Sequence, residues 1–313
     1  MLTITPVLKS IKTMLLPAKA ALGFAMLITS TACSPIKVLN AIVPESTYKL
    51  TSSVAYGTLP RQKLDIYLPN TDSVKLSHQK SLKVVVFFYG GSWDSGSRAD
   101  YKFVGEALAS QGFIVVIPDY RVYPEVLFPG FMADPAMAAS WVKHNIAQYN
   151  GDANQVFLAG HSAGAHIAVM LGVNAEYLAI QSLKPADFVG IIGLAGPYDF
   201  LPLKSDRLKT IFGSNAEQPK SQPINFVNGQ NPPMLLAVGK KDGTVWPRNS
   251  YNLAEKIKNN GGAAQVVTFE NYGHIDMVAK LAKPLRGDGE LLKTVADFIK
   301  NTPVDYKNST SLK

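Results

Sequence analysis

A serine stands at the centre of a G-x-S-x-G motif at residues 160–164. An apolar run at 156–159 precedes the motif and a run of small and apolar residues at 165–171 follows it, which predicts a strand that turns sharply into a helix. On such a turn the serine is exposed at the carboxyl edge of a sheet, and its strained backbone often has a positive φ. The flanking glycines let the strand and the helix approach each other. Ser162 is therefore a candidate nucleophile.

An acid and a histidine follow this serine along the chain, each just beyond an expected strand. Asp242 comes after the run 234–238, and His274 comes after the run 264–269. Because a neutral serine is a weak nucleophile, a histidine must take its proton during attack and return it to the leaving group. A carboxylate must orient that imidazole and stabilise its cation. Ser162, Asp242 and His274 thus form a candidate catalytic triad.

Three other aspartates are weaker candidates for the acid. Asp276 lies two residues past His274, too close in sequence to approach the back of that ring easily. Asp199 follows a turn at 196–198, and Asp119 is expected to pair locally and support its own loop. Asp242 is preferred, with Asp199 as a weaker competitor.

A glycine loop follows the strand expected to end at residue 89. Its first residues are Gly-Gly-Ser-Trp. The oxyanion that forms in acyl transfer needs preorganised N–H donors, and a glycine lets the backbone reach the substrate. We expect the amides of Gly91, Ser92 and Ala163 to form the oxyanion hole. The alternative is that Gly90 and Gly91 only make a simple turn.

The other histidines lack metal-binding or catalytic spacing. His161 and His166 are expected to pack or to form hydrogen bonds, His78 to lie in a loop and His144 on a helix surface. No H-E-x-x-H, Cys/His cluster or EF-hand spacing occurs, so we expect no metal. No G-x-G-x-x-G follows the first strand, so we expect no dinucleotide and no other cofactor.

The elements that must position these residues alternate between strands and helices. Continuous apolar runs without alternation predict parallel strands that are covered on both faces. Two antiparallel strands are expected first, at 48–55 and 64–68, and then strands at 82–89, 113–118, 156–159, 189–194, 234–238 and 264–269. Helices are expected at 101–111, 132–149, 163–171, 250–259 and 289–299. This order predicts an α/β fold, with a mostly parallel sheet, helices on both faces and ligands at the carboxyl ends of the strands.

The substrate pocket is harder to predict than the reacting groups. The segment 198–232 is long and polar, and it is expected to form a small lid or wall over the site. Trp93 and Trp246 stand beside the candidate loops, where each would either line a substrate pocket or pack in the core.

Composition indicates a globular protein. Of the 313 residues, 47% are hydrophobic and 17% are charged, which suits a core that needs no disulfide bonds. The net charge is +8, but the basic residues are scattered and form no arginine-rich run. We therefore expect no nucleic-acid partner.

The first 33 residues have the features of a targeting segment. Lysines come first, and the apolar stretch at 20–29 is too short to span a bilayer comfortably. Ser-Thr-Ala directly before Cys33, the only cysteine, resembles a bacterial lipoprotein signal in which that cysteine is lipidated. We expect export and a lipid anchor at a bacterial membrane, facing the periplasm or the exterior. The alternatives are a plain signal peptide cut near Ala32, an uncleaved anchor, and a true start at Met14 instead of Met1.

Several motifs together resemble the α/β-hydrolase superfamily over roughly residues 48–301. They are most similar to its carboxylesterase-like branch of feruloyl-esterase-related proteins, isoprenylcysteine methylesterases and kynurenine formamidases. The motifs are Gly-Gly-Ser-Trp at 90–93, Asp-Tyr-Arg at 119–121, Tyr-Pro-Glu at 123–125, Gly-His-Ser-Ala-Gly-Ala-His at 160–166, Gly-x-x-Asp-x-x-Val at 239–245 and Gly-His at 273–274. The resemblance implies Ser162 as nucleophile, Asp242 as acid, His274 as base and the glycine loop as oxyanion hole.

One residue departs from the pattern of this branch. Tyr89 stands where a histidine usually precedes the two glycines. Because the oxyanion donors are backbone groups, we expect the hole to persist, with the Tyr89 hydroxyl as a candidate to brace the loop.

The sequence thus predicts a signal segment at 1–33, a tether at 34–47, an α/β-hydrolase domain at 48–301 and a flexible tail at 302–313. The domain is expected to be a serine hydrolase that cleaves small-molecule carboxylic esters through an acyl-enzyme. One alternative is an amide or formamide hydrolase with the same triad. Another is an inactive hydrolase-fold binding protein or membrane-tethered scaffold.

Overall fold

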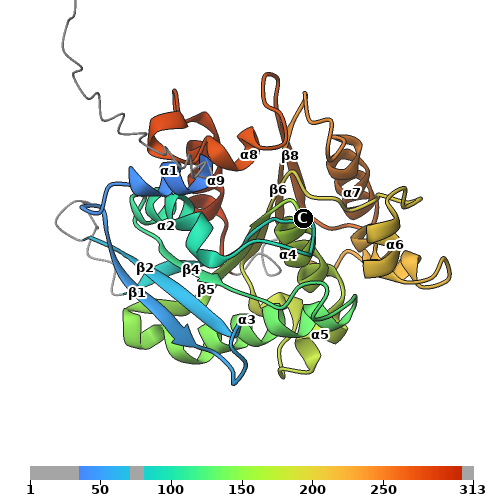
Figure 1. Cartoon of the computed structure of the whole chain (residues 1–313), viewed down its shortest axis with the longest axis horizontal. Helices are drawn as coiled ribbons and strands as arrows, with labels where there is room; N and C mark the ends of the chain where they lie inside the picture. Colours follow the sequence, from blue (N-terminus) through green and yellow to red (C-terminus); the bar gives the residue numbers. More distant parts are fainter. Residues whose placement is uncertain (1–34, 71–80, 305–313) are drawn as a thin grey trace, which may run out of the picture. The chain divides into compact units, whose positions relative to one another are not determined.

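The computed structural model describes residues 35–70 and 81–304 (Figure 1). Eight strands of that part form one sheet in the order β1-β2-β4-β3-β5-β6-β7-β8. Their bounds are β1 Tyr48–Ala55, β2 Lys63–Pro69, β3 Leu82–Phe88, β4 Ile114–Pro118, β5 Gly151–His161, β6 Gly190–Leu194, β7 Met234–Gly239 and β8 Ala264–Phe269. The pairs β1–β2 and β2–β4 are antiparallel, and all other neighbours are parallel. The predicted mostly parallel sheet is confirmed.

Helices cover both faces of this sheet, as predicted. Figure 1 shows α2 and α9 on one face and α3 and α5 on the other, where α5 also contacts α4. The helices are α1 Pro35–Ala41, α2 Lys102–Ala109, α3 Ala133–Asn145, α4 Ala163–Val173, α5 Ala175–Ala179, α6 Asp206–Phe212, α7 Arg248–Asn259, α8 Asp276–Ala279 and α9 Glu290–Asn301. Short 3-10 turns are η1 Arg98–Tyr101, η2 Gly130–Met132, η3 Ile146–Tyr149, η4 Pro185–Asp187, η5 Gln218–Ser221, η6 Pro223–Phe226 and η7 Lys283–Leu285.

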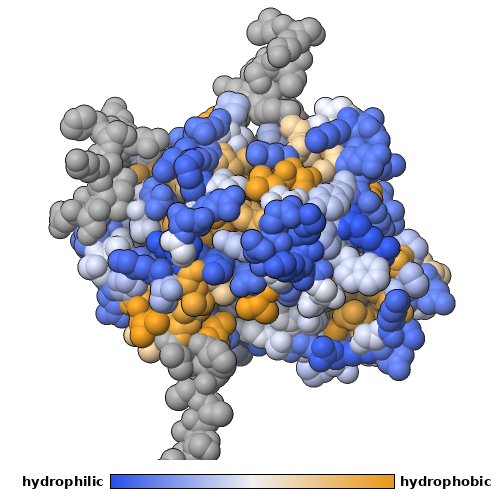
Figure 2. Space-filling model, turned by 90° about the horizontal axis from the view of Figure 1, so that it is seen from above, coloured by the Kyte–Doolittle hydropathy of each residue, from blue (hydrophilic) through white to orange (hydrophobic). Residues whose placement is uncertain are grey.

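The central strands are apolar because both faces of the sheet are covered. Every residue of β4, β6 and β7 is buried, which explains their unbroken apolar runs. The edge strand β1 is mostly exposed instead. Figure 2 shows apolar patches lying between hydrophilic residues on the face seen from above, as is usual for the surface of a folded domain.

Strand β5 is longer than the run 156–159 that predicted it, because it pairs with β3 on one side and with β6 on the other. Phe88 of β3 lies opposite Gly160, and His161 lies opposite Leu194 of β6. This register brings the loops after β3 and β5 to the same carboxyl edge.

Residues 35–47 do not form the tether that the sequence suggested. Helix α1 lies within this segment, and its Ile36 and Leu39 pack against the core. The side-chain amide of Asn40 donates to the Ala99 carbonyl at 2.9 Å, and Val43 is buried. Pro35 begins the helix, a position where proline favours rather than prevents helix formation. The described part of this segment therefore belongs to the folded domain.

The predicted signal segment at 1–33, with Cys33, lies outside the described residues, as do His78 and most of the predicted tail. Thr302, the first tail residue, is buried, and its hydroxyl donates to the Phe298 carbonyl at 2.7 Å at the end of α9. Within the described ranges, no helix has the length and apolar character needed to cross a membrane.

Candidate active site

The turn between β5 and α4 has the geometry that its sequence predicted. Ser162 has φ 55° and ψ −122°, and its amide donates to the Leu194 carbonyl of β6 at 2.9 Å. A Cβ on Gly160 would overlap the backbone of Gly164, and a Cβ on Gly164 would overlap the carbonyl of Phe88. Both glycines are therefore needed for the close approach of α4 to the sheet.

Ser162, His274 and Asp242 lie in one hydrogen-bonded row. His274 Nε2 is 2.9 Å from Ser162 Oγ, and His274 Nδ1 is 2.8 Å from Asp242 Oδ2. The Asp242 side chain is fully buried, and its other oxygen, Oδ1, accepts the amides of Thr244 and Val245 at 2.9 and 2.8 Å. A carboxylate so placed assigns the proton to Nδ1, which leaves Nε2 free to accept the serine proton.

The competing aspartates have other partners. Asp276 Oδ2 accepts the Gly273 amide at 2.8 Å, so it shapes the histidine loop from the side rather than contacting the ring. Asp199 Oδ2 accepts the Asn252 side-chain amide at 2.7 Å. Among the described residues, only Asp242 pairs with the His274 ring.

The loop after β3 turns tightly beside Ser162. Gly91, Ser92 and Trp93 all have positive φ, at 134°, 52° and 59°. The Gly91 carbonyl accepts the amides of Asp94 and Ser95, both at 3.0 Å, which fixes the turn. Within the described part of the chain, the amides of Gly91, Ser92 and Ala163 donate to no protein group. Three unused donors around a candidate nucleophile can receive an oxyanion.

Tyr89 supports this loop through its buried hydroxyl group. Its buried hydroxyl donates to Asp119 Oδ1 at 3.0 Å and accepts from Arg61 Nη2 at 3.0 Å. The same Arg61 nitrogen donates to the Gly96 carbonyl of the loop at 2.8 Å. Burial raises the pKa of Tyr89 well above its usual value, so the phenol stays protonated and keeps donating to Asp119.

Two further tyrosines complete the support. Tyr101 and Tyr120 stack on the Tyr89 ring, with centroids 5.6 and 4.6 Å away. The Tyr101 hydroxyl accepts the Gly90 amide at 3.2 Å, and the Tyr120 hydroxyl donates to the Tyr89 carbonyl at 2.6 Å. Sequence reasoning did not find these two residues or Arg61. Arg61 lies in a turn before β2 with no motif around it, whereas Tyr120 stood within the Asp-Tyr-Arg motif.

Asp119 has the local supporting role that the sequence suggested. It accepts the Arg98 amide at 2.7 Å and pairs with the Arg98 guanidinium, which also contacts Asp65 at 2.9 Å. This carboxylate therefore supports the loop through Tyr89 and has no contact with the triad.

The two histidines beside Ser162 are packing residues. His161 Nε2 donates to the His274 carbonyl at 3.1 Å, and His166 Nε2 donates to the Ser221 carbonyl at 2.7 Å. Burial lowers the pKa of His161 to about 3, with the nearby His274 adding to the shift, and burial lowers that of His166 to about 4. Both rings are neutral at pH 7. His144 is exposed on α3, as expected for a residue on a helix surface.

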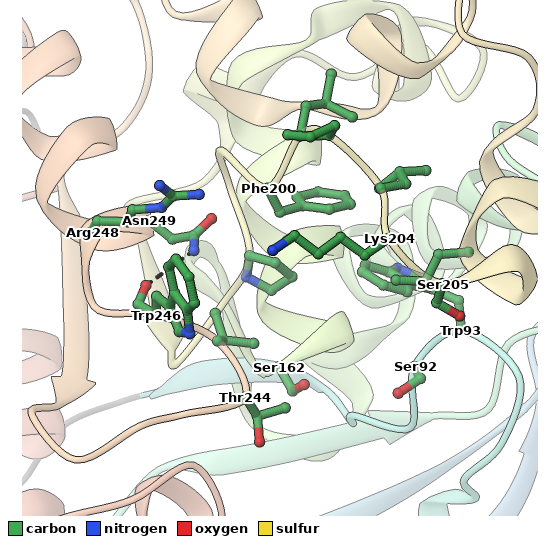
Figure 3. A pocket seen from close by; sticks show the side chains of 16 residues that line it. Ser92, Trp93, Ser162, Phe200, Lys204, Ser205, Thr244, Trp246, Arg248 and Asn249 are labelled. Atoms are coloured by element: carbon green, nitrogen blue, oxygen red, sulfur yellow. Dashed lines mark hydrogen bonds between the residues drawn. The ribbon is translucent and has the colours of Figure 1, made fainter.

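A cavity of about 370 Å³ opens above Ser162 (Figure 3). Much of its wall comes from residues 200–205 and 208, within the segment that the sequence predicted as a lid or wall. Both candidate tryptophans line it: Trp93 is buried at one side, whereas Trp246 is 51% exposed. Within the described ranges, no group of three or more His, Cys, Asp or Glu side chains is placed to hold a metal ion.

Comparison with protein families identifies related sequences. The BD-FAE family model matches residues 64–257. An isoprenylcysteine alpha-carbonyl methylesterase, ICME, of Arabidopsis thaliana is 30% identical over 75% of this chain and 58% of that protein. Esterase LipC of Mycobacterium tuberculosis is 28% identical over 66% of this chain and 54% of that protein. The chain thus spans little more than half the length of these curated relatives.

Solved structures share the fold. A truncated carbohydrate esterase from gut microbiota superposes with a TM-score of 0.70 at 23% identity, covering 83% of this chain and 98% of the other. Esterase B from Lactobacillus rhamnosis superposes with a TM-score of 0.71 at 21% identity, covering 88% of this chain and 94% of the other. The expected α/β-hydrolase fold is therefore confirmed.

Proposed function

Because this chain belongs to the BD-FAE family, in a carboxylesterase-like branch of the α/β-hydrolases, we propose that it is a serine hydrolase that cleaves carboxylic esters. The observation that carries the proposal is the row Ser162–His274–Asp242, with both hydrogen bonds below 3.0 Å. Relatives named as esterases support the same reaction class.

The first half of the reaction transfers the acyl group to the enzyme. Ser162 Oγ attacks the ester carbonyl carbon while its proton passes to His274 Nε2, and the C=O electron pair moves onto the oxygen. When the tetrahedral intermediate collapses, the ester C–O bond breaks. His274 then returns its proton to the departing alkoxide, which leaves as the alcohol.

The second half releases the acid. Water gives one proton to His274 Nε2 and attacks the acyl-enzyme carbonyl, and collapse of the new intermediate breaks the bond to Ser162 Oγ. The proton on His274 returns to that oxygen, which restores the serine. Asp242 stays ionised throughout and stabilises the imidazolium in both halves.

The oxyanion of each intermediate is assigned to the amides of Gly91, Ser92 and Ala163. Backbone donors held in a braced loop need no reorganisation when charge develops. Support comes from the absence of any other acceptor for these amides within the described residues.

Replacing the nucleophile tests this function. We expect Ser162→Ala to remove turnover of a short p-nitrophenyl ester while leaving the circular dichroism spectrum and melting curve intact. The matched control is Ser52→Ala, because Ser52 is exposed on the edge strand β1 and lies away from the pocket lining. Retained turnover in the Ser162→Ala variant would refute the assignment.

We also propose that the protein is exported and lipid-anchored through Cys33. The support is the sequence pattern alone: a lysine-bearing leader, a short apolar stretch and small residues before the only cysteine. Acyl chains add about 0.8 kcal/mol of membrane affinity per buried CH₂ group. Mass spectrometry of the mature N-terminus is the test. An acylated cysteine is expected, and an unmodified N-terminus downstream of Cys33 would overturn the proposal.

A further inference from the structure

Two cations line the pocket from different parts of the chain. Lys204 comes from the segment 198–232, the wall segment, at a point before α6. Arg248 is the first residue of α7. Figure 3 shows the Lys204 side chain extending across the pocket toward Trp246. The Lys204 Nζ lies 5.9 Å from the centre of the Trp246 ring, and the Arg248 guanidinium carbon lies 4.9 Å from it. The exposed indole thus holds both charges at one side of the cavity.

Neither cation has an ion-pair partner within the described part of the chain. Other basic residues of the same wall segment are paired: Arg207 with Asp94, Lys209 with Asp206 and Lys220 with Glu217. No aspartate or glutamate is among the residues that line the pocket. The pocket therefore carries two positive charges and no negative one.

The rest of the lining suits a hydrocarbon chain. The apolar residues of the lining include Trp93, Phe200, Leu203 and Leu208. Figure 3 shows Trp93 on the side of the pocket opposite Trp246. An apolar body with a negative group at its end would match both parts of this pocket, because the body gains from burial and the charge gains from the cations.

We propose that the substrate is an ester that carries a carboxylate or a similar anionic group, bound by Lys204 and Arg248. This inference rests on the proposed esterase function and names the substrate class of that same site. The negative group is held on the acid part or on the alcohol part of the ester, separated from the ester carbonyl by an apolar spacer.

Matched pairs of esters test the inference. The p-nitrophenyl monoester of adipic acid is compared with p-nitrophenyl hexanoate, which has the same chain length without the charge. The second pair is p-acetoxybenzoate and its methyl ester. In this pair the carboxylate is present or masked on the alcohol part of the acetate ester. The readout is the ratio of kcat/KM for the anionic ester to that for the neutral ester, after subtraction of hydrolysis measured with Ser162→Ala.

The wild-type enzyme is expected to favour the anionic member of at least one pair, and added salt is expected to weaken that preference. In the double variant Lys204→Gln/Arg248→Gln the ratio should fall by about tenfold, the effect of two nearby screened charges. The control Lys220→Gln removes a lysine of the same segment that does not line the pocket, and it should keep the ratio.

An unchanged ratio in the double variant, or a wild-type ratio that does not respond to salt, would overturn the inference and leave the esterase function standing. Loss of turnover for every ester in the wild-type protein would instead contradict the esterase function itself. The two failures are therefore distinguishable.

Discussion

At the scale of single residues, Asp242, the proposed acid of the triad, is the most informative. One carboxylate oxygen of Asp242 accepts the backbone amides of Thr244 and Val245, and the other pairs with the His274 ring. Because this carboxylate is fully buried and both of its oxygens have partners, it is placed to hold the imidazole in one orientation and one tautomer.

Replacing that acid by its amide tests the role. Asp242→Asn should keep the fold but lower kcat by about 10³–10⁴-fold, because an amide favours the wrong histidine tautomer. Steady-state kinetics on a neutral p-nitrophenyl ester give the number. Asp199→Asn serves as the control, since Asp199 contacts Asn252 and not the triad. A loss below tenfold in Asp242→Asn, or an equal loss in the control, would exclude Asp242 as the acid.

At the scale of elements, helix α4 sets the position of Ser162, the proposed nucleophile. Gly164 in its first turn lies against the carbonyls of Phe88 and Tyr89, so the helix touches the backbone of β3 and of the glycine loop. The proposed nucleophile and the proposed oxyanion donors are thus positioned by one helix–strand contact.

A single methyl group should disturb that contact. Gly164→Ala is expected to lower the free energy of unfolding by about 2–3 kcal/mol and to lower kcat as well, because overlap with the β3 backbone must push α4 away. Urea unfolding and ester kinetics measure the two effects. Gly243→Ala is the matched control, since nothing lies within 4 Å of the added Cβ and a change within about 0.5 kcal/mol is expected there. Equal stability of the two variants would contradict the packing argument.

The same helix is hydrogen-bonded to the segment 198–232 through His166, whose ring donates to the Ser221 carbonyl in η5. Its folded-state pKa, about 4, is lower than the ordinary value of 6.5, because burial disfavours the charged ring. Below pH 6.5 the unfolded chain therefore binds a proton that the folded chain does not. The stability contributed by the neutral ring is complete above that pH and is lost as the pH falls from 6.5 toward 4.

His166→Gln removes this titration while its amide can still donate to the Ser221 carbonyl. Between pH 7.5 and 5.0 the wild-type protein should lose about 2 kcal/mol more unfolding free energy than this variant. Urea titrations at both pH values measure the difference. His144→Gln, on the exposed face of α3, should behave like the wild type. The same loss in the wild type and in His166→Gln would show that His166 is not held neutral.

At the scale of the whole molecule, much of the architecture was predictable from the sequence. Parallel strands that are covered on both faces must be apolar throughout, so each of them shows in the sequence as a continuous apolar run. The residues proposed to carry the chemistry stand directly after these runs. The parallel pairing of the strands from β3 to β8 then brings the loops after β3, β5, β7 and β8 to the same edge of the sheet.

Other features depend on contacts that a linear pattern does not contain. Helix α1 was missed because its seven residues are too few to form a stable helix alone, and it gains stability by packing against the domain. The support of Tyr89 by Arg61 joins residues 28 positions apart, one in the turn before β2 and the other just after β3. The cations beside Trp246 come from the wall segment and from α7, which the sequence alone does not bring together.

The most direct test of the central claim is covalent labelling of the folded protein with a fluorophosphonate probe, read by intact mass and peptide mapping. The account predicts a single adduct on Ser162, lost in Ser162→Ala and strongly slowed in Asp242→Asn, because the probe reacts only with a serine that its histidine activates. A folded protein that takes no label, or that carries the label on another serine, would contradict it.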